Sequence, residues 1–114
     1  MAIVNTDNIQ SQMKKGLLEY CILSIIQRGE AYPSDIIQEL KDSGLQVLEG
    51  TLYPLLTRLK NAGYLDYRWV ESLSGPPRKY FTMSEQGKEF YKSLDSTWKE
   101  ISTAVHKITN KNII

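Results

Sequence analysis

The stretch from Gly50 to Gly63 constrains the fold of this 114-residue chain more than any other segment. Four leucines in it follow the i, i+3, i+4, i+7 spacing that aligns apolar side chains along one face of an α-helix: Leu52, Leu55, Leu56 and Leu59. Such a stripe has to face a core. We therefore expect a helix here with Thr51 as the N-cap, Pro54 in the first turn and Gly63 as the C-terminal stop.

The opposite face of this expected helix is polar and cationic. It carries no carboxylate, and its members are Gly50, Pro54, Thr57 and Asn61, with Tyr53, Arg58 and Lys60 on its shoulders. A solvated helix face usually mixes both signs of charge, so this face suits phosphate oxygens and base edges. Taken alone, the stretch fits an amphipathic surface helix of any small domain equally well.

Upstream, apolar residues predict a central first helix from about Asn8 to Arg28, which Gly29 ends. Its broad apolar stripe consists of Met13, Leu17, Leu18, Cys21, Ile22, Ile25 and Ile26. A helix at the surface of a small domain does not need that much apolar area. We therefore expect it to be buried on more than one side and open to sharing with a second subunit.

A second, short helix is expected to open around Ser34 and to end at Ser43 and Gly44. An extended connector, residues 45–48, then leads into the cationic helix. Helix, short helix, connector and helix in about fifty residues outline a helix-turn-helix of the winged type.

After Gly63 the pattern changes from a helical period to alternation. Residues 65–70 and 78–83 alternate in the manner of strands, and residues 72–77, Ser-Leu-Ser-Gly-Pro-Pro, supply turn chemistry. We expect a β-hairpin whose loop is longer than a two-residue turn. Arg78 and Lys79 would lie at the root of its tip, where their position beside the cationic helix favours a nucleic-acid contact over a solvated hairpin end.

The last helix is expected to begin after Ser84 as its N-cap. Its apolar residues recur at steps of three and four, the spacing of a heptad seam: Tyr91, Leu94, Trp98, Ile101, Val105 and Ile108. The partner of this seam is either the first helix or a second copy of the chain. Because a free seam would expose a large apolar patch, we predict a homodimer, with Leu17 and Cys21 of the first helix contributing.

The net charge of +1 is unevenly distributed along the chain. Residues 1–49 carry four basic and seven acidic side chains, residues 50–82 five and two, and residues 83–114 five and four. The positive segment coincides with the expected contact surface. Lys14 and Lys15 would enlarge that surface if the fold brought them alongside it.

Several classes of protein are not expected. The start M-A-I-V-N-T-D-N is polar too early for a signal peptide, and no apolar run approaches the ~20 residues needed to span a bilayer, so we expect a cytoplasmic protein without a membrane partner. Cys21, the single cysteine, is expected to be a buried thiol, and the single histidine, His106, has no companion ligands. The sequence holds no nucleophile with a base, phosphate loop or metal-ligand cluster, so we expect neither an enzyme nor a bound metal or cofactor.

The sequence resembles the PadR family of bacterial transcriptional regulators from about Lys15 to Trp98. The segments that carry the resemblance are G-L-L-E-Y-C-I-L-S-I-I, E-G-T-L-Y-P-L-L-T-R-L-K-N-A-G-Y-L and S-G-P-P-R-K-Y-F-T-M-S-E-Q-G-K-E-F. Departures are mild, such as Lys60 where the family more often has an acid. The resemblance implies a mainly α fold with a small β-hairpin (α+β). A winged helix-turn-helix over residues 1–83 and a single C-terminal dimerisation helix over residues 84–114, as in the short members, would form one structural unit.

The resemblance also implies which residues contact DNA: Ser34, Thr51, Tyr53, Pro54, Thr57, Arg58, Arg78 and Lys79. The implied function is that of a dimeric, sequence-specific regulator, a ligand-responsive repressor that binds an inverted-repeat operator. In multidrug-sensing short members, a tryptophan of the final helix stacks flat aromatic ligands. That tryptophan corresponds to Trp98, with Asp95 one turn earlier to compensate a cationic ligand, although Trp98 fits a purely packing role equally well.

Two alternative functions use the same fold. One is a winged-helix module that binds protein, and the other is a protein that binds small planar aromatic molecules and has lost DNA binding. An acid in place of Arg58 or Lys79 would favour the second alternative, and neither position is acidic. The cationic helix face and the Arg78-Lys79 pair favour DNA.

Overall fold

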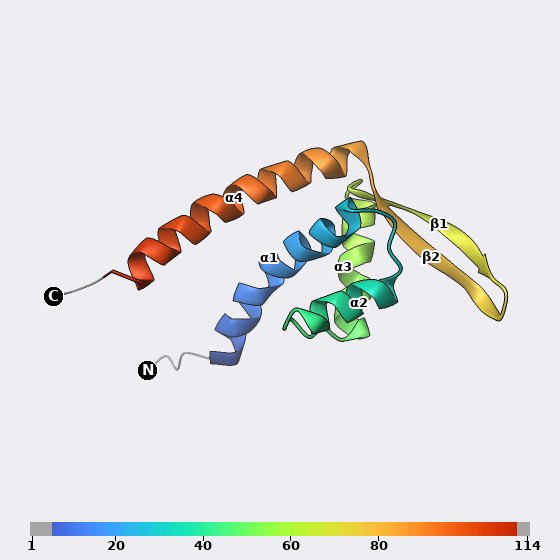
Figure 1. Ribbon diagram of the computed structural model, residues 1–114, viewed down its shortest axis with the longest axis horizontal. Coiled ribbons are helices and arrows are strands. Elements are labelled where there is room, and N and C mark those ends of the chain that lie inside the picture. Colours follow the sequence, from blue (N-terminus) through green and yellow to red (C-terminus); the bar gives the residue numbers. More distant parts are fainter. Residues whose placement is uncertain (1–5, 112–114) are drawn as a thin grey trace.

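Residues 6–111, which the computed structural model describes, form four helices and one antiparallel β-hairpin (Figure 1). In chain order the elements are α1 (Thr6–Gln27), α2 (Pro33–Asp42), α3 (Glu49–Asn61), β1 (Leu65–Ser72), β2 (Gly75–Met83) and α4 (Glu85–Thr109). The expected class, mainly helical with a small hairpin, is confirmed. The expected DNA-binding segment 1–83 and the expected C-terminal segment 84–114 extend beyond the described part of the chain, which omits residues 1–5 and 112–114.

The core lies where α1, α2 and α3 meet. The leucine stripe of α3 is buried as expected and joins apolar side chains of α1, α2 and β1 in one cluster. The most deeply buried members of this cluster are Ile22, Leu23, Ile26, Ile36, Leu52, Leu56 and Leu65. Met13 and Leu17 are exposed, so the N-terminal half of α1 is less enclosed than its apolar stripe suggests.

The start of α3 differs from the sequence prediction. The N-cap is Leu48, whose backbone is extended and whose carbonyl accepts the Thr51 N–H at 2.9 Å, so Thr51 is not the cap. Pro54 consequently lies inside the helix and not in its first turn. The carbonyl four residues earlier, which loses its hydrogen-bond donor, belongs to the exposed Gly50, where water can satisfy it. Gly63 ends α3 as predicted, with a φ of 89°.

The hairpin, which we call the wing, has a tighter turn than predicted. Ser72 pairs with Gly75, so its loop contains two residues and β2 begins before the two prolines. The register shifts between Val70 and Ser72, so that Pro76 and Pro77 fall in a bulge of β2. A bulge tolerates residues without an N–H, which explains why turn-like residues are part of a strand here.

The wing leads directly into α4. Ser84 is the N-cap as predicted: its hydroxyl accepts the Gly87 N–H at 3.0 Å and donates to the Gly63 carbonyl at 2.6 Å. Gly87 is buried against the Tyr64 carbonyl, which itself accepts the Ser84 N–H at 3.1 Å. The end of α3, the end of β2 and the start of α4 are thereby fixed to one another.

The far half of α4 projects from the rest of the chain (Figure 1). The radius of gyration is 17.0 Å, whereas a compact domain of this length has about 13 Å. Tyr91 and Leu94 pack against the core, so these two residues of the seam have their partners within the same chain. The cause is α1, which runs beside the first turns of α4. Beyond them the remaining seam residues are exposed: Trp98, Ile101, Val105 and Ile108.

Candidate nucleic-acid interface

The exposed face of α3 carries the polar residues that the sequence predicted. Thr51, Tyr53, Pro54 and Thr57 are all exposed, because the leucines between them turn inward. Tyr53 keeps 49 % of its surface accessible although it is a large aromatic side chain. Such a side chain can contact base edges without further rearrangement of the core.

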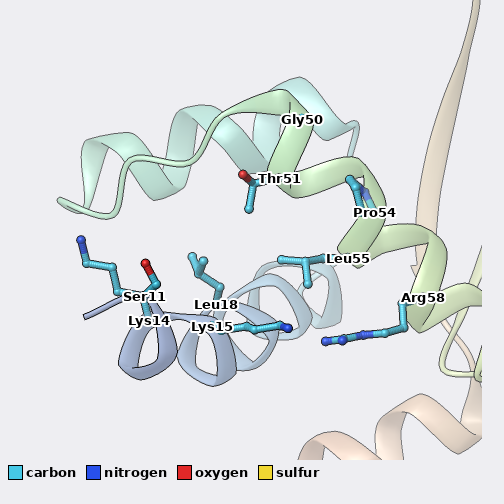
Figure 2. A pocket seen from close by; sticks show the side chains of 9 residues that line it. All are labelled: Ser11, Lys14, Lys15, Leu18, Gly50, Thr51, Pro54, Leu55 and Arg58. Atoms are coloured by element: carbon cyan, nitrogen blue, oxygen red, sulfur yellow. The ribbon is translucent and has the colours of Figure 1, made fainter. Parts of the chain in front are cut away.

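A groove of about 530 Å³ separates this face from the N-terminal half of α1. Leu18, Leu55 and Pro54 form apolar parts of its lining, and Lys14 and Lys15 stand on the α1 side (Figure 2). In Figure 2 the ends of Lys15 and Arg58 point toward one another from the two helices. The fold therefore brings Lys14 and Lys15 alongside the cationic helix, and the basic surface includes part of α1.

Arg58 has a partner that sequence reasoning did not predict. Its guanidinium forms an ion pair with Glu19 of α1, whose side chain is only 19 % exposed. A DNA contact by Arg58 would have to share the guanidinium with this carboxylate. Lys14 and Lys15 form no ion pair among those found in the described residues, so they are the freer cations of this groove.

A second groove, of about 480 Å³, lies between the start of α2, the start of α3 and the wing. It brings together four predicted contact residues from three elements: Ser34, Tyr53, Arg78 and Lys79. The Arg78 Nη2 donates to the Ser34 Oγ at 3.0 Å, which joins the wing to α2 directly. Glu49 also lines the groove and is its one carboxylate, so the groove is net cationic.

Arg78 and Lys79 both rest on aromatic rings, a feature that sequence reasoning missed. The Arg78 guanidinium carbon lies 4.1 Å from the centre of the Tyr32 ring. The Lys79 Nζ lies 4.2 Å from the centre of Tyr67 and 5.2 Å from that of Trp69. For Lys79, the pairing of the two strands could have indicated this contact, because Trp69 is its cross-strand partner.

Tyr32 also contacts the wing on the side of Tyr80. Their ring centres are 3.6 Å apart, and a side-chain hydrogen bond with Tyr32 raises the pKa of Tyr80. The Arg68 guanidinium carbon lies 5.4 Å from the Tyr80 ring, and its Nη2 donates to Glu30 at 2.8 Å. The hydrogen bond from Arg68 lowers the pKa of Glu30.

The predicted ligand residue Trp98 lines a third, mostly apolar groove of about 710 Å³ between α1 and α4. Asp95 is not among the lining residues. Its carboxylate accepts the Tyr20 hydroxyl and pairs with Lys99 at 3.1 Å, and these interactions lower the pKa of Asp95. Cys21 is half-buried against the core, and this burial raises the pKa of its thiol.

Two further findings concern the described residues as a whole. None of their helices is both long and apolar enough to cross a bilayer. They contain no group of three or more histidine, cysteine or acidic side chains that could hold a metal ion.

A three-helix core, a two-stranded wing and an exposed cationic helix define the winged helix-turn-helix regulators of transcription. The chain belongs to the transcriptional regulator PadR-like family, whose model matches residues 22–93. It is thus a transcriptional regulator with a DNA-binding fold.

Similar structures extend over nearly the whole chain. A PadR-like transcription factor from Bacteroides fragilis is 54 % identical, with a TM-score of 0.76 over 89 % of this chain and 98 % of that chain. A PadR-like transcriptional regulator from Bacillus cereus is 35 % identical, with a TM-score of 0.81 over 90 % of this chain and 100 % of that one. A relative by sequence, an uncharacterized protein of Lysinibacillus sphaericus, is 26 % identical in an alignment of 100 residues that covers 85 % of this chain and 92 % of the relative.

Proposed function

We propose that this protein is a homodimeric, sequence-specific repressor of transcription that binds an inverted-repeat operator and releases it when a planar aromatic ligand binds. The observation that carries the DNA-binding part is the convergence of residues from α1, α2, α3 and the wing. The two grooves that flank α3 place cations on both sides of its exposed face.

The exposed face of α3 suits the major groove, where Tyr53 and Thr57 would read base edges. The ammonium groups of Lys14 and Lys15 on one side, and the side chains of Arg78 and Lys79 on the other, suit the phosphates of the flanking backbone. Phosphate contacts fix the register of a protein on DNA and supply most of its affinity, while base contacts select the sequence.

The proposed second copy is supported by the surface area of the chain. Its accessible surface is 8534 Å², whereas a compact monomer of this mass exposes about 6,400 Å². Much of the apolar surface lies on one face of α4 and the adjoining part of α1, with these exposed members: Met13, Leu17, Trp98, Ile101, Val105 and Ile108. Pairing with a second copy buries this face and places two cationic helices in two-fold symmetry, which matches an inverted repeat.

The proposed ligand response is supported by the groove that Trp98 lines. Its lining is mainly apolar, and an indole offers a flat polarizable surface for a planar ligand. A ligand changes DNA affinity only if it binds the DNA-free arrangement of the dimer more tightly. Repression needs fewer contacts than activation, because a dimer bound over a promoter blocks RNA polymerase without having to recruit it.

The DNA-binding proposal is tested with duplexes selected from a random-sequence library by binding to the purified protein. We expect the selected sequences to share an inverted repeat. Changing both Lys14 and Lys15 to Gln should weaken binding strongly and reduce its dependence on salt. Changing Lys88 and Lys92 of α4 to Gln alters the net charge equally and should have little effect, since neither lines the grooves beside α3. A protein that enriches no duplex contradicts the proposal.

The dimer is tested by light scattering at micromolar concentration. Wild type should have twice the mass of one chain, and Ile101→Asp with Val105→Asp should give a folded monomer, because two buried charges oppose pairing. Thr103→Asp places a charge on the opposite side of α4 and should leave the dimer intact. A monomeric wild type would contradict this part of the proposal and leave the DNA-binding part standing.

A further inference from the structure

Tyr32 is fixed against the wing by backbone pairing. Ala31 forms an antiparallel bridge with Phe81 of β2, with its N–H 3.1 Å from the Phe81 carbonyl and the reciprocal bond at 2.9 Å. Tyr32, the next residue, therefore lies opposite Tyr80, and it is also the N-cap of α2. One residue thus belongs both to the start of α2 and to the edge of the wing.

The ring of Tyr32 fits between two side chains of β2. Arg78 and Tyr80 are two residues apart, so they share a face of the strand and lie about 6.7 Å from one another along it. The ring centre of Tyr32 lies 4.1 Å from the Arg78 guanidinium carbon and 3.6 Å from the Tyr80 ring centre. Arg68, the cross-strand partner of Tyr80, continues the stack and is itself held by Glu30.

This stack restricts Arg78 before any DNA is bound. A guanidinium that lies over a ring and donates to the Ser34 hydroxyl has already lost much of the rotational freedom that a phosphate contact would remove. Tyr32 is partly exposed and lies outside the buried cluster, so packing of the core does not require its ring.

We propose that Tyr32 is a positioning residue for DNA binding, whose ring holds the Arg78 guanidinium beside Ser34 so that both engage the same stretch of phosphate backbone. The inference rests on the proposed function, because it presupposes that Arg78 contacts DNA. Tyr32 would raise the affinity for DNA only by holding Arg78 in place, without touching the DNA itself.

A double-mutant cycle tests this inference with the selected duplex as the probe. Tyr32→Leu should weaken binding about two- to fivefold, the range of one exposed cation–π contact. Tyr32→Phe keeps the ring and should bind like wild type. In a protein that already carries Arg78→Ala, Tyr32→Leu should cause no further loss. Equal losses in both backgrounds, or full affinity of Tyr32→Leu, would overturn the inference.

Tyr67→Leu is the matched control. Tyr67 lies beneath Lys79, and strand alternation puts it on the face of the wing opposite Arg78. Its loss should therefore weaken binding by the same factor with and without Arg78. If Tyr67→Leu also lost its effect in the Arg78→Ala protein, non-additivity would be a general property of the wing and the inference would fail.

Two further measurements distinguish a loss of the Tyr32–Arg78 contact from misfolding and from failure of the proposed function. Arg78→Lys keeps the charge on an exposed side chain but lacks the planar guanidinium that stacks on a ring and donates to Ser34, so affinity should fall with an unchanged salt slope. In the DNA-free protein, the Tyr32 ring should shift the Arg78 side-chain resonance upfield, and Tyr32→Leu should abolish that shift. An unshifted Arg78 resonance would refute the inference, whereas a wild type that binds no DNA but shows the shift would refute only the proposed function.

Discussion

Gly87→Ala should destabilise the protein although alanine is the better helix former. A Cβ at this position would lie 2.0 Å from the Tyr64 carbonyl oxygen, far inside van der Waals contact. That oxygen cannot move away freely, because it accepts the Ser84 N–H. Overpacking costs about 1–3 kcal/mol, and we take the upper end since the obstacle is backbone. The gain in helix propensity offsets about 1 kcal/mol, which leaves a net loss of about 2 kcal/mol.

The measurement is thermal or urea unfolding at one fixed protein concentration, because association contributes to stability. A loss of about 2 kcal/mol lowers the melting temperature by about 8 °C in a chain of this size. Gly50→Ala is the matched control: a Cβ there meets nothing within 4 Å, so it should be neutral or stabilise by up to about 0.5 kcal/mol. A Gly87→Ala protein as stable as wild type would show that α4 does not pass this close to the end of α3.

Three further predictions concern the candidate site and α4. Lys79→Ala should weaken binding to all duplexes and lower the salt slope by about one. Changing Tyr53 or Thr57 should mainly reduce discrimination between duplexes. Competition titrations at several salt concentrations separate the two effects. A planar cationic dye should quench Trp98 in a variant that keeps only this tryptophan and should release DNA, and unchanged dye affinity in Trp98→Ala would leave the indole a packing role. The pKa of Asp95 is lower in the folded state because of its hydrogen bonds, so its stabilising contribution is present above the unfolded value of about 3.9 and is lost as pH falls through the folded value. Asp95→Asn should therefore flatten the acid side of the stability profile, and a profile identical to wild type would contradict this.

The order of helices and the wing followed from local patterns in the sequence. The leucine spacing of α3 and the cap at Ser84 depend on neighbours within one or two turns, and the structure has both. The cap at Leu48 was missed because its side chain gives no signal: the cap is made by an extended backbone alone. The prolines after Ser74 suggested a long loop, but a bulge allowed them into a strand.

Partners that are distant in the chain could not be predicted in the same way. The ion pair of Arg58 has no local signal in the sequence, because Glu19 lies 39 positions earlier and only the packing of α1 against α3 brings the two side chains together. The Tyr32 stack depends on a single bridge between Ala31 and Phe81, for which the sequence has no periodic signal. Arg78 and Lys79 were predicted as a pair from their place after the turn residues, but the aromatic rings on which their side chains rest were not predicted.

The Ser84 hydroxyl bonds both to Gly87 in the first turn of α4 and to Gly63 at the end of α3, so a rotation of α4 about its base is transmitted to α3. This helix has 25 residues and, at about 1.5 Å per residue, a length of about 37 Å. A tilt of about 10° at its base would displace its far end by about 6 Å. Conversely, a molecule that moves the far end by a few ångströms would turn the base by only a few degrees, and the Ser84 bond to Gly63 would pass that rotation to the end of α3. In the proposed dimer, small displacements around Trp98 would alter the spacing of the two α3 helices without any change within those helices.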